Sequence, residues 1–331
     1  MYTDRINMYR KLEKMLDTNL LVYVTSDRRG CETQIARDVI DPFINQLDSI
    51  GAIDRLSLYL YTKGGDTAAA WNIVNLLRQF CNHLQVIVPH KAHSAGTLIS
   101  IGANSIIMTK QATLGPIDPS LNTPLNPAVP KVDATYPVSV EAVKGYLEFA
   151  KDELGITDDN ALASIFLKLS ENVHPLVLGQ VYRSRAQMKM LAEQLLKNQI
   201  NDREQISRIT SFLCSESGSH DYTINRREAK ETLGLNVEKP DYSLYSVIKE
   251  VYDDISAELE FNIPYTTEHL LESKARDGSY RIKKALLESS KGCSYYFSTE
   301  GKIAEQIRQD GKRIIQNQKT FEGWRSERFR R

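Results

Sequence analysis

The sequence has few cysteines and no long apolar run, and each shortage excludes a class of protein. Four cysteines are scattered over 331 residues without a CxxC pair, which argues against a disulfide framework and a zinc site. No apolar stretch reaches the roughly twenty residues of a membrane-spanning helix, and the polar first residues are not a secretory signal. Basic and acidic residues balance at 42 each, so no charge excess indicates nucleic acid. We expect a cytoplasmic protein with no transmembrane segment, metal, cofactor or nucleic-acid partner.

Strand-like and helix-like runs alternate through the first third of the chain. Residues 20–25 and 56–62 are apolar and strand-like, and helical patterns cover 35–47 and 68–80. This alternation predicts an α/β fold with right-handed crossovers and mostly parallel pairing. In such sheets functional groups gather at the carboxyl ends of the strands.

Two strand-to-helix junctions carry residues suited to chemistry at that edge. Gly64 and Gly65 follow one strand, and Ser94 follows the next strand at a predicted helix start. Glycines let an anionic oxygen approach the backbone closely, and a helix start presents unpaired N–H groups. A serine that faces backbone donors is the minimum apparatus for acyl transfer. The alternative interpretation is a helix-capping serine and a tight Gly-Gly turn.

The order of four motifs gives the acyl-transfer interpretation its support. The motifs are Gly64-Gly65, Ser94-x-Gly96, the Leu-Gly-Pro-Ile-Asp-Pro run at 114–119, and the segment 221–235 that ends in a Gly-Leu turn. With these motifs in this order, the sequence resembles the serine dehydrogenase proteinases, which are related to signal peptide peptidase A and the Clp proteolytic subunit. The resemblance covers residues 20–235.

The resemblance implies a ClpP/crotonase-like fold with repeated β-β-α units and a serine endopeptidase activity. Ser94 is then the nucleophile, and the N–H groups of Gly65 and Ala95 form the oxyanion hole. Gly64 and Asp66 are expected at the substrate, which is a peptide or an unfolded protein paired along the strand that leaves the glycines. Asp66 is also expected to cap the helix that follows.

The base that activates Ser94 is not identified by the sequence. Clp proteolytic subunits use a histidine about twenty-five residues after the serine, and residues 117–119 lack one here. Lys168 is a candidate because the preceding segment resembles the one before the lysine of signal peptide peptidases, and burial can make lysine a base. His174 is a second candidate at the start of a long helix, where capping is its alternative role. His93 is disfavoured because adjacent residues at such a turn point apart.

We expect a peptidase domain at 1–238, including a helical segment at 139–214, and a mixed C-terminal extension of unknown role at 239–331. The resemblance further implies a homo-oligomer built through the helical segment, and an unfoldase partner stays open. Two other functions remain: a catalytically silent subunit or scaffold, and a crotonase-like acyl-CoA enzyme, for which no nucleotide site is apparent.

Overall fold

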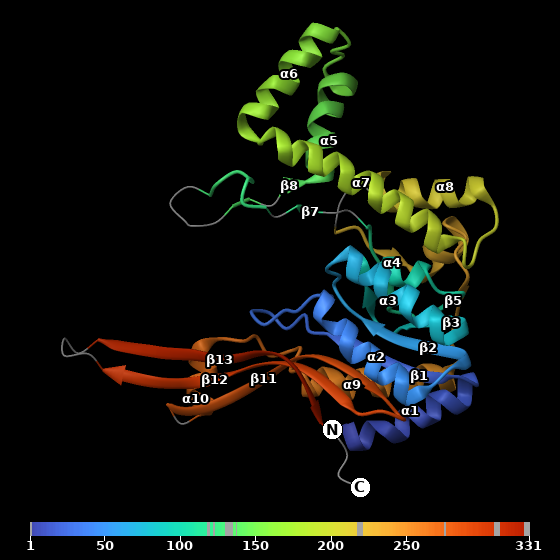
Figure 1. Cartoon of the computed structure of the whole chain (residues 1–331), viewed down its shortest axis with the longest axis vertical. Helices are drawn as coiled ribbons and strands as arrows, with labels where there is room; N and C mark the ends of the chain where they lie inside the picture. The colour runs from blue at the N-terminus through green and yellow to red at the C-terminus, as the bar shows by residue number, and fades with distance from the viewer. Residues whose placement is uncertain are drawn as a thin grey trace. The chain divides into compact units, whose positions relative to one another are not determined.

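The computed structural model forms two compact units, which comprise residues 1–114 with 223–331, and residues 115–222 (Figure 1). The structure describes residues 2–117, 120–121, 123–129, 135–136, 138–216, 221–274, 276–307 and 312–327.

The larger unit is built on an eight-stranded sheet of order β10-β5-β3-β2-β1-β11-β12-β13. Strands β10 to β1 run parallel, and β11, β12 and β13 continue the sheet antiparallel. The strands are β1 (Asn19–Thr25), β2 (Ile53–Tyr61), β3 (Cys81–Val88), β5 (Ser105–Met108), β10 (Val237–Glu238), β11 (Asp277–Ser289), β12 (Ser294–Ile307) and β13 (Arg313–Glu327). The α/β prediction is confirmed, and β11 and β12 form a hairpin within the predicted C-terminal extension.

Helices cover both faces of this sheet because its central strands are apolar on both sides. Tyr59 and Tyr61 of β2 pack in one core cluster with α1 and α9, and the alternating residues Leu58 and Leu60 are also fully buried. The helices of this unit are α1 (Tyr2–Leu16), α2 (Ile40–Ile50), α3 (Thr67–Phe80), α4 (Ala95–Ile101), α9 (Tyr242–Glu258) and α10 (Thr267–Ser273), with a 3-10 turn at Arg37–Val39 and a π-helical turn at Glu228–Thr232.

A small second sheet extends the carboxyl edge of the parallel strands. Its order is β4-β6-β9, formed by β4 (Lys91–Ala92), β6 (Thr113–Leu114) and β9 (Ile224–Asn225). Thr62 pairs with Ala92 in a parallel bridge, which places the chain leaving β4 beside the chain leaving β2. The two junctions singled out in the sequence therefore meet at one edge.

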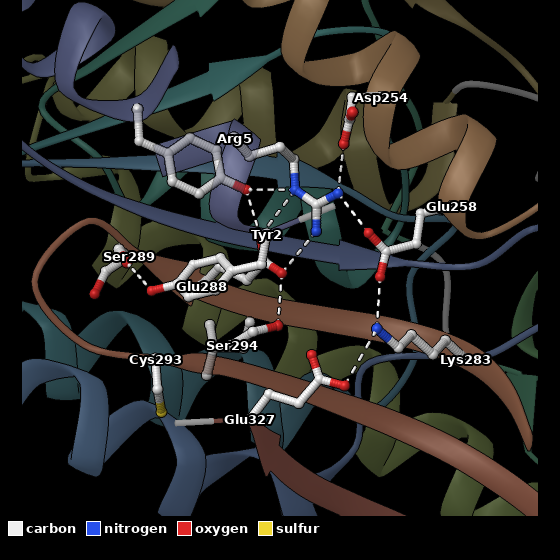
Figure 2. A network of polar contacts seen from close by, with 12 residues as sticks. Tyr2, Arg5, Asp254, Glu258, Lys283, Glu288, Ser289, Cys293, Ser294 and Glu327 are labelled. Atoms are coloured by element: carbon white, nitrogen blue, oxygen red, sulfur yellow. Dashed lines mark hydrogen bonds and ion pairs between the residues drawn. The ribbon is translucent and has the colours of Figure 1, made fainter. Parts of the chain in front are cut away.

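A buried polar network joins α1 and α9 to β11 (Figure 2). The Arg5 guanidinium on α1 is fully buried and donates to Glu288 of β11 at 2.8 and 3.1 Å. Its Nη1 also lies 2.5 Å from Asp254 and from Glu258 on α9, and the Tyr9 hydroxyl donates to Glu288. Every buried charge in this set has a partner, which buried ions require.

The smaller unit is mainly helical, as predicted for 139–214. A cluster of Val138, Val140, Val177 and Val181 forms a core, whereas α6 has no buried residue. Its elements are β7 (Ser120–Leu121), β8 (Val138–Ser139), α5 (Val140–Glu148), a π-helical turn (Phe149–Glu153), α6 (Asp159–Asn172), α7 (Pro175–Leu196), α8 (Arg203–Ser211) and a second π-helical turn (Phe212–Glu216).

Candidate active site

Ser94 occupies a strained turn between β4 and α4. Its backbone has φ 52° and ψ −114°, a conformation that non-glycine residues rarely adopt. Its side chain makes no capping hydrogen bond to the helix that it precedes, and it is half-buried. The capping role that the sequence left open is therefore not the one observed.

Neighbouring groups hold this turn in place. The N–H of Gly96 donates to the His93 carbonyl at 2.8 Å, and the N–H of Leu98 donates to the Ser94 carbonyl at 3.0 Å. A Cβ on Gly96 would lie 2.4 Å from Cγ2 of Thr62. The glycine two residues after the serine is thus required by close packing against the end of β2.

Gly64 lies directly against Ser94. Its φ is +117°, and a Cβ there would lie 2.8 Å from the Ser94 Cβ and 2.9 Å from the His93 carbonyl oxygen. The Thr62 hydroxyl accepts the Gly64 N–H at 3.0 Å and is 2.8 Å from the Thr25 hydroxyl. Sequence reasoning missed the positioning role of Thr62, although a hydroxyl residue two positions before a glycine pair suits a turn of this kind.

Ile35 pairs with residues 64–66, called the glycine strand below, and sets the orientation of their peptide groups. The Ile35 N–H donates to the Gly64 carbonyl, and the Asp66 N–H donates to the Ile35 carbonyl, both at 2.8 Å. Because peptide groups alternate along an extended strand, the N–H of Gly65 then points to the opposite edge. The predicted helix start at Ile35 was wrong, since α2 begins at Ile40 after a 3-10 turn.

Two backbone donors remain available at the turns that carry Gly64 and Ser94. Ala95 is the first residue of α4, and the first N–H groups of a helix have no partner within it. Within the described residues, neither the Ala95 N–H nor the Gly65 N–H donates to a protein acceptor. Donors of this kind, close to a serine, are suited to binding a developing oxyanion.

Asp66 caps α3, as predicted. Its carboxylate accepts the N–H groups of Ala68 at 2.7 Å and Ala69 at 3.2 Å, and it also accepts from Nε of Arg37 at 3.2 Å. These bonds account for the cap, and the additional role in substrate binding stays a prediction.

His93 and the predicted bases occupy different surroundings. The His93 ring lies 2.8 Å from the Thr113 hydroxyl through Nε2. Lys168 is on α6 of the smaller unit, with a side chain that is 70% exposed and an Nζ 2.6 Å from Glu171. His174 precedes α7, and its Nδ1 accepts the Leu176 N–H at 3.2 Å, which is the capping role named in the sequence analysis.

The remaining candidates of the sequence analysis lie elsewhere. Asp118 and Pro119, which complete the third motif, fall outside the described residues. The structure brings Gly64, Ala95 and Ser94 together within the larger unit, and it places Lys168 and His174 in the other unit.

Comparison with known proteins finds a family model that matches the central segment of the chain. Residues 50–144 match the family of ClpP-like SDH-type serine proteinases. The predicted resemblance to serine dehydrogenase proteinases is confirmed, and with it the ClpP-like fold. The matched segment contains the glycine pair, Ser94 and Ala95.

Relatives and solved structures resemble this chain over larger spans. Two uncharacterized proteins of Methanocaldococcus jannaschii are 32% identical over 199 residues (59% of this chain and 59% of that protein) and 31% identical over 182 residues (55% and 51%). The chain spans little more than half the length of these relatives. The 1510-N membrane-bound stomatin-specific protease is 17% identical with a TM-score of 0.38, covering 68% of this chain and 82% of that one. ClpP1 of Listeria monocytogenes is 13% identical with a TM-score of 0.38, covering 71% and 99%.

In the described part of the chain, every helix is too short or too polar to cross a membrane.

Proposed function

We propose that this protein is a serine endopeptidase in which Ser94 is the nucleophile. The observation that carries the proposal is the strained backbone of Ser94, whose side chain makes no cap and lies against Gly64. Strain of about 1–3 kcal/mol persists only where surrounding structure enforces it, and it is common at active sites. The family match over residues 50–144 gives independent support.

The reaction proceeds through an acyl-enzyme. The Ser94 Oγ attacks the carbonyl carbon of the scissile peptide, and its proton passes to a base and then to the leaving amine. The carbonyl oxygen becomes an oxyanion bound by the N–H groups of Gly65 and Ala95. Water then attacks the ester, returns a proton to Ser94 through the base, and releases the new carboxylate.

The substrate is an extended peptide segment that pairs with the open edge of the glycine strand. Ile35 already occupies one edge of residues 64–66, so a peptide adds on the edge to which the Gly65 N–H points. Main-chain pairing of this type selects extended conformations rather than a particular side chain. Unfolded proteins and flexible peptides therefore fit this site, and compact folded proteins do not.

Lys168 and His174 remain the proposed alternatives for the base. A lysine base needs burial to lower its pKa, whereas the Lys168 side chain is mainly exposed within its own unit. The His174 ring accepts at Nδ1, so its neutral form carries the proton on Nε2. Either role requires a change of surroundings, which assembly of subunits can supply.

A homo-oligomer is supported by apolar side chains on the smaller unit. Leu167 on α6 and Leu176 and Tyr182 on α7 are 63%, 64% and 76% exposed, and association with a second chain would remove this apolar area from water. A monomer in light scattering would count against this part of the proposal.

A fluorophosphonate probe tests the nucleophile directly. We expect the purified protein to label and Ser94→Ala to lose all labelling, while Ser49→Ala, at an exposed serine of α2, labels as the wild type does. Of Lys168→Gln and His174→Asn, the variant that loses labelling identifies the base. Absence of labelling in the folded oligomer would overturn the peptidase proposal in favour of a silent subunit.

A further inference from the structure

A cavity of about 430 Å³ lies in the larger unit, lined by residues that are absent from the Ser94 site. It is bounded by the end of α9, by α10 and by the first half of β11, and Arg28 enters it from the loop after β1. Its volume falls within the range of about 300–1,000 Å³ that small-molecule sites occupy.

The lining carries an excess of positive charge. Four cationic side chains face two carboxylates, and both carboxylates are already paired. Glu260 lies 2.5 Å from Arg28, and Glu258 lies 2.6 Å from Lys283 and 2.5 Å from Arg5. The four cations are Arg28, Lys274, Arg281 and Lys283.

Lys274 supplies the uncompensated charge. Arg281 is held by Glu300 at 2.9 Å, whereas the Lys274 amine has no acceptor among the described residues and is half-buried. A partly desolvated ammonium without a counter-ion favours the binding of an anion.

Arg28 supplies a rigid second donor. Its side chain is 6% exposed, and its Nε donates to the Ile263 carbonyl at 2.7 Å while Nη1 pairs with Glu260. Nη2 has no acceptor among the described residues. A fixed guanidinium with an unused N–H edge suits the oxygens of a phosphate or a carboxylate.

The rest of the lining suits a partly apolar ligand. Tyr265, Leu270 and Tyr280 line the same cavity, and Tyr280 is nearly buried. We propose that this cavity binds a small anionic molecule, with its phosphate or carboxylate groups at Arg28 and Lys274 and its carbon skeleton against these three side chains.

Titration calorimetry on the whole chain tests the site, with inorganic pyrophosphate and citrate as separate probes at constant ionic strength. We expect saturable binding of at least one probe at one site per chain, and the tighter probe distinguishes phosphate from carboxylate recognition. Lys274→Gln is expected to weaken binding about tenfold, the loss of one charge-assisted hydrogen bond. The variant is expected to fold as the wild type does, because the Lys274 amine has no partner to lose among the described residues.

A matched control and a second variant make the result decisive. Lys302→Gln removes an exposed lysine of β12 outside the cavity lining and is expected to keep the wild-type affinity. Arg28→Lys retains the charge but loses the fork of donors, so it also weakens binding. The proposal is overturned if neither probe saturates below about 10 mM, or if Lys274→Gln and Lys302→Gln bind equally well.

Discussion

The two units differ in how tightly they hold the residues proposed for catalysis. In the larger unit, Ser94 and Gly64 adopt unusual backbone conformations that close packing enforces. In the smaller unit, Lys168 on α6 and His174 before α7 are exposed, and among the described residues their side chains have local partners only. The difference teaches that the proposed nucleophile and its proposed donors lie together in one unit, whereas each proposed base lies in the other unit at an exposed position.

The largest test of this contrast removes a buried charge. Arg5→Met leaves the Glu288 carboxylate buried without its cation, and breaking a buried pair in this way costs about 3–5 kcal/mol. Lys168→Met breaks the exposed pair with Glu171 and is expected to cost less than about 1 kcal/mol. Urea unfolding of both variants measures the difference, and equal losses would contradict the contrast between the units.

A smaller effect is expected at Gly65, whose N–H is a proposed oxyanion donor. A Cβ on Gly65 would lie 2.3 Å from the Ile35 carbonyl oxygen at a φ of +141°, so Gly65→Ala combines backbone strain with overpacking and costs about 2–5 kcal/mol. Gly51→Ala is the control, because its φ is +81° and nothing lies within 4 Å of the added carbon. It carries strain alone, about 1–3 kcal/mol. Thermal unfolding of both variants measures the two losses of stability. Equal losses would show that the contact with Ile35 relaxes without cost.

Much of this architecture was predictable, because it follows from local pattern. The apolar runs of β1 and β2 and the cap by Asp66 depend on residues adjacent in sequence. The pairing of Ile35 with the glycine strand and the insertion of β11 beside β1 were not predictable, because they join segments that are distant in sequence. The positive φ of Ser94 was hidden for another reason: serine usually caps a helix at such a position.

Acid should loosen the larger unit first. Burial alone would raise the pKa values of Asp27 and Glu258. Lys91 lowers the pKa of Asp27 below its ordinary value, and Arg5 and Lys283 do the same for Glu258. A carboxylate with a lowered folded-state pKa stabilises the protein above its ordinary pKa of about 4, and that stability is lost as pH falls through the folded value.

Hydrogen exchange between neutral pH and about pH 3 measures this loss by segment. Peptides of β1 and α9 should lose protection as the pH falls below about 4. The exposed pair of Lys168 and Glu171 is screened by solvent, so α6 should change little over the same range. Acid sensitivity confined to α6 would reverse the expected order.

The smallest effect concerns the cap of α7. His174→Ala removes the acceptor of the Leu176 N–H and should cost about 1 kcal/mol, as lost caps do. His174→Asn keeps an acceptor at the same position and should retain that stability, yet it cannot serve as a base. Peptide hydrolysis that persists in His174→Asn would exclude this residue from catalysis. Because this variant keeps the cap, a loss of activity could not be attributed to unfolding.

The pairing of β11 with β1 also determines how late in synthesis this part of the larger unit can be completed. The Ser26 N–H donates to the Lys284 carbonyl at 2.8 Å, so the loop that continues to Ile35 lacks this anchor until residues near 284 have been translated. Pairings between such distant segments form late, because the intervening chain must first be brought together. The loop that pairs with residues 64–66 therefore gains its anchor on β11 only near the end of translation. For the proposed peptidase, this order of synthesis implies that the Gly65 donor reaches its final support only when most of the chain has been made.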